Sequence, residues 1–301
     1  MEAAALALLL LGLALAEPVS VVLARAAWPA RDPVGALLVW QAVGLAGGTA
    51  LLGAGVVFAL SPLGDSPAAA VGAFGSALVD LRLPAEMDTV HVLALVATIV
   101  LATRLLGVLV VTATRTLRMR RRHRDLVDVL GTAWSAAPGA RVLDHPVPVA
   151  YCLPGWRSRL VLSAGVLDVL DAAELDAVLA HERAHLRERH DLVVLPFVAW
   201  GATAPFVRGM RNAQVSVAAL VEMRADDVAV SQVRPIELAR ALKAVGGGAP
   251  AAALSSFADA LGARQARILV PPAPLAPPLR ALVRLGALGL VAAPALMLAF
   301  A

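Results

Sequence analysis

Long uninterrupted blocks of apolar residues restrict this chain to a membrane-embedded fold. Blocks of about twenty or more apolar residues are long enough to cross a bilayer, and four of them lie at Ala3–Ala24, Val34–Leu60, Val90–Val111 and Leu282–Ala301. Only 16% of the 301 residues are charged, and the mean hydropathy is +0.78, so an ordinary soluble domain is excluded. We therefore expect a mainly α-helical membrane protein with four transmembrane helices.

The first block has one feature of a cleaved signal peptide, because Ala14-Leu15-Ala16 would suit a signal peptidase. However, Glu2 stands where a signal peptide carries positive charge, and apolar sequence resumes after Pro18. These residues favour a retained transmembrane helix.

The arginines are distributed unevenly around the blocks. The third block leads into RTLRMRRRHR, which begins at Arg115, whereas Ser61–Asp88 holds only Arg82 beside four acidic residues. Because short cytoplasmic loops are enriched in Lys and Arg, we expect the segment after Arg115 in the cytoplasm and both termini outside the cell membrane. The flanking arginines also account for a pI near 10.4. Without aromatic residues among them, direct nucleic-acid binding is not expected.

This pattern predicts three regions. They are a three-helix transmembrane region over residues 1–112, a cytoplasmic domain over 113–270, and a Pro-rich linker with the last transmembrane helix over 271–301. Within the cytoplasmic domain, Arg141–Leu153 and Ser158–Gly165 are rich in β-branched residues and flank a Pro-Gly turn, which predicts two short strands. The domain is therefore expected to be α+β with a small β-sheet.

Helices are expected after these strands. The segment DVLDAAELDAVLAHERAHLRERHD has Asp171 as its N-cap and Glu174 three residues later, which is a capping-box arrangement. It predicts one long helix that continues to Asp191. The apolar run Leu192–Phe206 is short for a membrane span, and a further helix is expected over about Gln214–Val230.

His181, Glu182 and His185 form the pattern H-E-x-x-H inside the long predicted helix. At this spacing two imidazoles point at one zinc ion, and the glutamate lies beside the metal-bound water. The alternative is a charged, solvated helix face, because arginines are interspersed with these residues. A metal site is favoured because HERAHLRERHD holds three of the chain's six histidines.

A catalytic zinc ion takes three protein ligands and a water, so a third ligand is required. Glu222 is the candidate because it lies four residues before Asp226, a like-charge spacing that a bound cation would favour. Asp226 is then expected to accept a hydrogen bond from a ligand imidazole. His190 would lie off the ligand face of a continuous helix, five residues after His185, and is expected to support the site or face the solvent.

The proposed ligands constrain the topology. Glu222 reaches His181 and His185 only if Leu192–Phe206 does not cross the membrane, since a crossing would leave Glu222 on the opposite side. We therefore expect this run to be a buried helix or a shallow re-entrant element, which leaves the number of spans at four.

A peptidase mechanism follows from this site. Zinc lowers the pKa of its water to about 7, and Glu182 would take the water proton and pass it to the leaving amine. A peptide substrate is expected to add as a strand along Val147–Leu153, in contact with Val147, Val149 and Tyr151.

Five residues carry smaller hypotheses. Glu17 and Arg104 lie inside predicted spans, where an unpaired charge costs about 2.5–3.5 kcal/mol, so we expect them to pair or to snorkel to the interface. Gly44 and Gly48 form a G-x-x-x-G, which permits close helix approach. The single cysteine, Cys152, excludes an intramolecular disulfide, and is either an inhibitory zinc-binding thiolate or an ordinary buried thiol.

The segment CLPGWRSRLVLSAGVLDVLDAAELDAVLAHERAHLRERHDL, together with EMRADD, resembles the antirepressor-type membrane zinc peptidases of the BlaR/MecR group, gluzincins related to the HtpX and CAAX-protease families. The resemblance rests on His181, Glu182, His185, Glu222 and Asp226. It implies a cytoplasmic gluzincin domain that uses Zn²⁺ to cleave a regulatory protein, often a winged-helix repressor of the BlaI type. The external penicillin-binding domain of such sensors has no counterpart in this sequence, so β-lactam sensing is not expected.

Two other functions remain open. One is HtpX-like quality control of damaged membrane proteins, which differs from regulation in the breadth of its substrates. The other is a signalling receptor with a structural zinc site, which a fourth protein ligand on the metal would favour.

Overall fold

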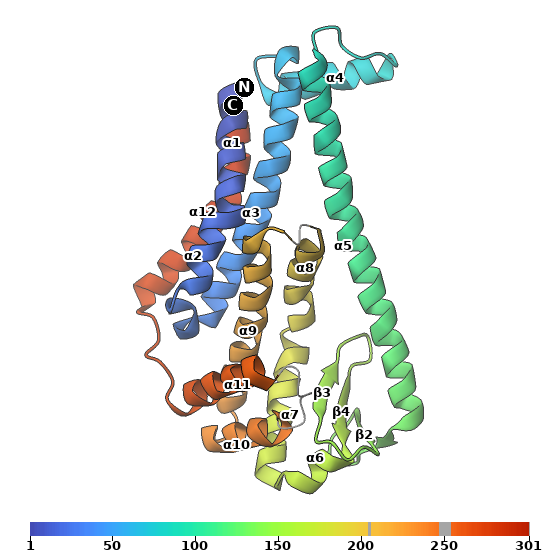
Figure 1. Cartoon of the computed structure of the whole chain (residues 1–301), viewed down its shortest axis with the longest axis vertical. Helices are drawn as coiled ribbons and strands as arrows, with labels where there is room; N and C mark the ends of the chain where they lie inside the picture. Colours follow the sequence, from blue (N-terminus) through green and yellow to red (C-terminus); the bar gives the residue numbers. More distant parts are fainter. Residues whose placement is uncertain (204–205, 247–253, 301) are drawn as a thin grey trace. The chain divides into compact units, whose positions relative to one another are not determined.

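The computed structural model describes residues 1–203, 206–246 and 254–300, which form helices and one small mixed sheet (Figure 1). These residues divide into two compact units. The first comprises Met1–Val111, Phe197–Val217 and Leu275–Ala301, and the second comprises Thr112–Pro196 and Ala218–Pro274. Phe197–Val217 thus groups with the apolar helices, which differs from the continuous domain expected over residues 113–270.

Four helical segments of the described chain are long and apolar enough to cross a bilayer, as the apolar blocks predict. They are Glu2–Arg25, Pro33–Leu63, Thr89–Leu130 and Pro277–Ala299. The first contains α1 (Glu2–Ala14), the π-helical turn η1 (Leu15–Val19) and α2 (Ser20–Arg25), and the others contain α3 (Pro33–Leu60), α5 (Thr89–Leu130) and α12 (Pro277–Ala299). Both α1 and α12 pack along α3, and the short α4 (Pro67–Val79) follows α3 (Figure 1). α5 continues beyond the predicted end of its block at Val111, through the basic segment.

A proline accounts for the irregular turn in the first segment. Pro18 has no N–H, and its ring would collide with a carbonyl of the preceding α-helical turn. The backbone therefore widens into the single π-helical turn η1. Ser20 Oγ donates a hydrogen bond of 2.8 Å to the carbonyl oxygen of Leu15, five residues earlier, so this carbonyl keeps a partner inside an apolar helix.

α8 (His190–Thr203) and α9 (Arg208–Val230) form a helical hairpin (Figure 1). With 14 residues, α8 is too short to cross a bilayer. The described part of the apolar run, residues 192–203, thus lies in a short helix of a hairpin, and the buried or shallow re-entrant position expected for it stays a prediction. Its C-terminal part and the start of α9, within Phe197–Val217, lie in the first unit.

Two glycines allow this part of the hairpin to approach the apolar helices closely. A β-carbon at Gly44 of α3 would overlap the indole of Trp200 in α8. A β-carbon at Gly209 of α9 would overlap the carbonyl oxygen of Ala16 in η1. The close approach predicted at Gly44 is therefore present, although its partner is an aromatic side chain.

Two charged side chains hold the ends of the hairpin helices. Arg104 on α5 donates hydrogen bonds of 2.9 and 3.3 Å to the carbonyl oxygen of Thr203, the last residue of α8. Glu17 in η1 accepts a hydrogen bond of 3.1 Å from the Gly209 N–H, in the first turn of α9. Helix ends leave backbone groups without intrahelical partners, and their dipoles favour a cation at the C-terminus and an anion at the N-terminus. Among the described residues Glu17 and Arg104 therefore contact different helix ends and not each other, whereas snorkelling to the interface stays a prediction.

The second unit contains a four-stranded sheet in the order β1-β2-β4-β3. Its strands are β1 (Thr132–Ala133), β2 (Ala140–Leu143), β3 (Ala150–Leu153) and β4 (Arg159–Ser163). β2 runs parallel to β4, and β3 runs antiparallel to it. The single strand predicted over Arg141–Leu153 is wrong, because Pro146 and Pro148 cannot donate to a ladder and separate β2 from β3. The strand predicted within Ser158–Gly165 and the turn before it are confirmed.

α7 (Ala172–Arg187) lies at the centre of the second unit, after the short α6 (Ala164–Val169). Asp171 is its N-cap, and both hydrogen bonds of the predicted capping box with Glu174 are present. One side of α7 packs in a hydrophobic core with β4, and the other packs against α9, α10 (Pro235–Gly246) and α11 (Leu254–Leu269). The helix that carries H-E-x-x-H is therefore fixed on both sides.

α7 ends earlier than the sequence predicts. The helix was expected to continue to Asp191, but its last residue is Arg187, and Arg189 has a φ of 51°. A residue in the left-handed region ends an α-helix. α8 therefore starts at His190 in a new direction, and His190 does not lie on a continuation of the ligand helix.

The capping contacts at the hairpin are tested by substitution of Glu17. Glu17→Ala removes the acceptor of the Gly209 N–H and is expected to lower the free energy of unfolding by about 0.5–2 kcal/mol, as loss of a helix cap does. Glu17→Gln keeps an acceptor oxygen and is expected to lose less. Thermal unfolding of the purified protein in one detergent measures both. If Glu17→Arg combined with Arg104→Glu restores the stability that each single reversal loses, the two charges pair directly and the capping assignment is wrong.

Candidate metal centre and active site

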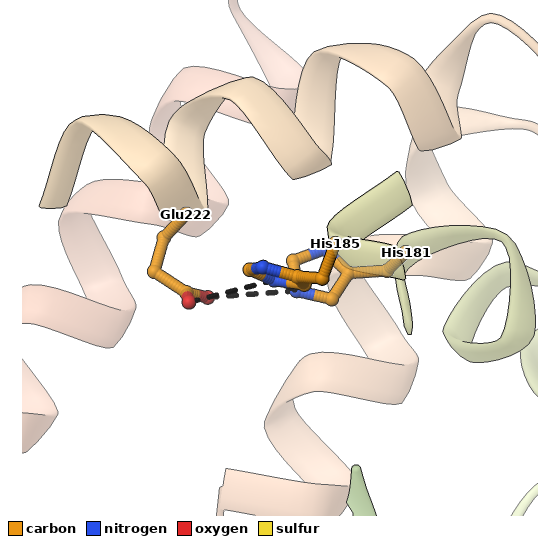
Figure 2. A group of neighbouring side chains, drawn as sticks. All are labelled: His181, His185 and Glu222. Atoms are coloured by element: carbon orange, nitrogen blue, oxygen red, sulfur yellow. Dashed lines mark hydrogen bonds and ion pairs between the residues drawn. The ribbon is translucent and has the colours of Figure 1, made fainter. Parts of the chain in front are cut away.

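Three side chains from α7 and α9 converge on one point (Figure 2). His181 and His185 lie one turn apart on α7, and Glu222 reaches them from α9. His181 Nε2 lies 3.1 Å from His185 Nε2 and 3.5 Å from Glu222 Oε2. The distance from His185 Nε2 to Glu222 Oε1 is also 3.5 Å. The structure thus brings together the three residues predicted as metal ligands.

The spacing and chemistry of these donors fit a zinc ion. Ligand atoms at about 2.0–2.2 Å from a tetrahedral zinc lie roughly 3.3–3.5 Å from one another. The two imidazole nitrogens lie 3.1 Å apart, and each lies 3.5 Å from one of the two Glu222 oxygens, which is close to this spacing. Two imidazoles and one carboxylate are also a donor set that catalytic zinc sites use, with a further position for water.

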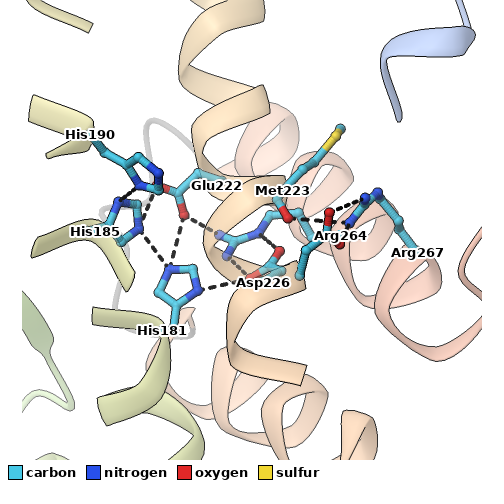
Figure 3. A network of polar contacts seen from close by, with 9 residues as sticks. His181, His185, His190, Glu222, Met223, Asp226, Arg264 and Arg267 are labelled. Carbon is cyan, nitrogen blue, oxygen red and sulfur yellow. Dashed lines mark hydrogen bonds and ion pairs between the residues drawn. The ribbon is translucent and has the colours of Figure 1, made fainter. Parts of the chain in front are cut away.

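Asp226 and Arg264 support two of these ligands (Figure 3). Asp226 Oδ1 lies 3.0 Å from His181 Nδ1, as predicted for a residue that orients a ligand imidazole. Arg264 on α11 contacts both Asp226 oxygens, at 2.8 and 3.0 Å, and its Nη1 lies 3.0 Å from Glu222 Oε2. Sequence analysis missed Arg264. Arg267, three residues later on α11, pairs with Asp227 at 2.7 and 3.0 Å.

His190 contacts the second ligand imidazole. Its Nδ1 lies 2.9 Å from His185 Nδ1, and its Nε2 lies 3.3 Å from Glu188 Oε2. Glu188 is held in turn by Arg224, with a shortest contact of 2.6 Å. The prediction that His190 lies off the ligand face assumed a continuous helix, and the chain reversal at Arg189 instead turns its ring toward His185. Nδ1 of each of the two imidazoles therefore has a polar atom of a neighbouring side chain within 3.0 Å.

Glu182 lies against the edge strand of the sheet. Its carboxylate lies next to the backbone N–H and the thiol of Cys152 in β3. Burial raises the pKa of the Cys152 thiol, so this group stays protonated. Of the two readings of Cys152, the structure thus supports a protonated thiol beside Glu182, outside the cluster of three metal donors.

β3 is an edge strand, as expected for the substrate-binding segment. Ser163 N–H donates to the Val149 carbonyl at 2.9 Å, so the backbone of Val149, and by alternation that of Tyr151, faces β4. Ala150 and Cys152 therefore present their backbone groups to the open edge. Val147 lies before the strand, where its N–H meets His145 Nδ1 at 3.2 Å, and the Tyr151 hydroxyl lies 2.8 Å from His123 Nε2.

The buried charges shift the pKa values of the ligands strongly. Burial disfavours a charged His181, but Asp226 and Glu222 outweigh this and raise its pKa to about 9. Burial likewise disfavours the Glu222 carboxylate, but His181 and the positive charge of Arg264 lower its pKa to about 2. Burial lowers the pKa of His185 to about 4. Burial also raises the pKa of Glu182, which makes it a better proton acceptor than an exposed carboxylate.

Comparison with known proteins agrees with this site. Residues 113–225 match the model of Peptidase family M48, which is less than half of the chain but includes His181, Glu182, His185 and Glu222. The plastoglobule-localized metallopeptidase 48 of Arabidopsis thaliana chloroplasts is 39% identical over 70 residues, which cover 23% of this chain and 20% of that protein. The match therefore spans only about a fifth of that relative's length. No solved structure matches the chain. The family match indicates a metallopeptidase, and the His-His-Glu cluster gives it a candidate metal site.

Zinc binding to the metal-free protein is expected to release about one proton at pH 7. With a pKa of about 9, His181 is protonated at this pH and must become neutral to bind zinc, whereas His185 is already neutral. The zinc affinity should therefore rise with pH up to about 9. Calorimetric titration in two buffers of different ionisation enthalpy measures the release, and Asp226→Asn should reduce it. A binding enthalpy that is the same in both buffers would contradict the raised pKa.

Arg264 is expected to contribute strongly to stability because its partner Asp226 is buried. Arg264→Met removes the guanidinium that contacts both oxygens of the Asp226 carboxylate and leaves His181 as its remaining partner, which should cost roughly 3–5 kcal/mol in the free energy of unfolding. Arg267→Met, three residues later on the same helix, is the matched control. Its partner Asp227 is 35% exposed, so the expected cost is only about 0–1 kcal/mol. Equal losses of stability in the two variants would refute the assigned role.

Proposed function

We propose that this protein is an integral-membrane zinc metalloendopeptidase. The observation that carries the proposal is the convergence of His181, His185 and Glu222 with Glu182 beside the open edge of β3. The family match over residues 113–225 supports the metallopeptidase activity. Four helices that are long and apolar enough to cross a bilayer support the membrane setting.

The residues of the site have distinct roles in the proposed peptide hydrolysis. His181, His185 and Glu222 would hold a zinc ion, which would supply Lewis-acid chemistry at the scissile carbonyl. Glu182 would take a proton from the attacking water and pass it to the nitrogen of the leaving amine. Asp226 and His190 hold the two imidazoles in place, since a metal-bound histidine needs a partner for its second nitrogen.

A substrate peptide would add to the sheet as a further strand at β3. Ala150 and Cys152 offer the backbone groups for this pairing, and strand addition is a common mode of peptide recognition. In the structure the Cys152 N–H lies next to the Glu182 carboxylate. A substrate strand that takes over this N–H would release the carboxylate toward the water, so substrate binding and proton transfer would be linked.

We propose a cytoplasmic protein as substrate, with the peptidase domain on the cytoplasmic side of the cell membrane and both termini outside. The distribution of arginines supports this orientation. The resemblance of the H-E-x-x-H and EMRADD segments to the BlaR/MecR group supports regulatory proteolysis of a repressor of the BlaI type. The second candidate is HtpX-like cleavage of damaged membrane proteins, and the match to Peptidase family M48 supports a metallopeptidase in either case.

Substitution of Glu182 tests the activity. Glu182→Gln is expected to bind zinc with wild-type stoichiometry but to lose peptide cleavage by a factor of about 10²–10⁴, the usual contribution of a general base. Metal content and cleavage of casein by the purified protein measure the two properties. Glu174→Gln, on the same helix, keeps its N-cap contact and should remain active.

A Glu182→Gln protein that still cleaves would disprove the assigned role. Proteins captured by the same variant in cells separate the two candidate functions. A single trapped repressor would support regulation, whereas a broad set of membrane proteins would support quality control.

A further inference from the structure

A basic pocket of about 600 Å³ lies in the first unit, where α2 meets the start of α9. Arg25, in the last turn of α2, lines it from one side. Arg208, Arg211 and Asn212, in the first turn of α9, line it from the other. Segments more than 180 residues apart in the sequence thus bring three guanidinium groups to one concave site.

The three arginines are exposed to solvent, and their charges have no ion-pair partner among the described residues. The only carboxylate in the lining is that of Glu17, which accepts the hydrogen bond from the Gly209 N–H. Two cations in the first turn of α9 also oppose the helix dipole, which favours negative charge there. The pocket therefore holds an excess of positive charge that an anion would neutralise.

The remaining lining identifies the kind of anion. Pro18, Val21 and Val22 form an apolar wall beside the arginines. All three belong to the first segment that is long and apolar enough to cross a bilayer. A ligand that complements both the arginines and the apolar wall has a phosphate group next to a hydrocarbon chain. Basic pockets between transmembrane helices bind anionic lipid headgroups for this reason.

We propose that this pocket binds an anionic phospholipid, with the phosphate at Arg25, Arg208 and Arg211 and the first part of an acyl chain against Val21 and Val22. Because α2 and α9 both line the pocket, the bound headgroup bridges the first span and the hairpin. The proposal is independent of the peptidase function, since none of these residues belongs to the metal centre.

Native mass spectrometry of the full-length protein with added phosphatidylglycerol or phosphatidylcholine tests the site. Wild type should retain phosphatidylglycerol in preference to phosphatidylcholine. The double variant Arg208→Gln/Arg211→Gln should lose about thirtyfold in affinity for phosphatidylglycerol, because each arginine near an anionic lipid contributes roughly fivefold. Arg284→Gln, which removes an exposed charge on α12 outside the pocket, should change the affinity less than twofold.

Two further measurements keep the outcome unambiguous. Arg208→Lys/Arg211→Lys retains the charge and should retain most of the binding, which separates loss of the site from loss of the fold. Inorganic phosphate should neither stabilise the protein nor displace the lipid. The proposal is overturned if the glutamine variant binds phosphatidylglycerol as wild type does, if Arg284→Gln loses as much, or if inorganic phosphate competes as well as the lipid.

Discussion

The capping of the α8–α9 hairpin among apolar helices is the constraint on which the rest of the structure depends. Glu222 can join His181 and His185 only if the chain turns back after α8. Such a turn leaves backbone carbonyl and N–H groups at two helix ends, and groups of this kind are costly without partners in an apolar environment. Arg104 and Glu17 supply the partners at Thr203 and Gly209. Glu17 and Arg104 thus lie inside apolar helices because they cap the ends of the hairpin helices. The hairpin in turn allows Glu222 to reach His181 and His185.

The charged groups around the candidate metal centre do not balance one another. Glu182, Glu222 and Asp226 contribute three carboxylates near the cluster, and Arg264 contributes one positive charge. With neutral imidazoles the site therefore carries an excess of two negative charges, which a divalent cation would neutralise. The pKa of His181, raised to about 9, is the consequence of the same excess, since a proton is the cation that the imidazole itself can take up.

The sequence predicted the parts of the site that depend on local spacing. H-E-x-x-H lies within one helix, and Asp171 with Glu174 fixes where that helix begins. It could not predict features that depend on a chain reversal or on distant contacts. The left-handed residue Arg189 redirects His190 toward His185, and no local pattern marks an arginine for this conformation. The contacts of Arg264 join segments 38 residues apart, which periodicity within one helix does not reveal.

The family match covers the candidate metal donors but not all of the residues that contact them. Residues 113–225 include both histidines, Glu182 and Glu222, so the metal donors lie within the matched region. Asp226 and Arg264, which contact the ligands, lie beyond its end, and Glu17 and Arg104, which cap the hairpin, lie before its start. A fragment restricted to residues 113–225 would therefore keep every candidate metal donor and lose the contacts of Asp226 and Arg264 with His181 and Glu222.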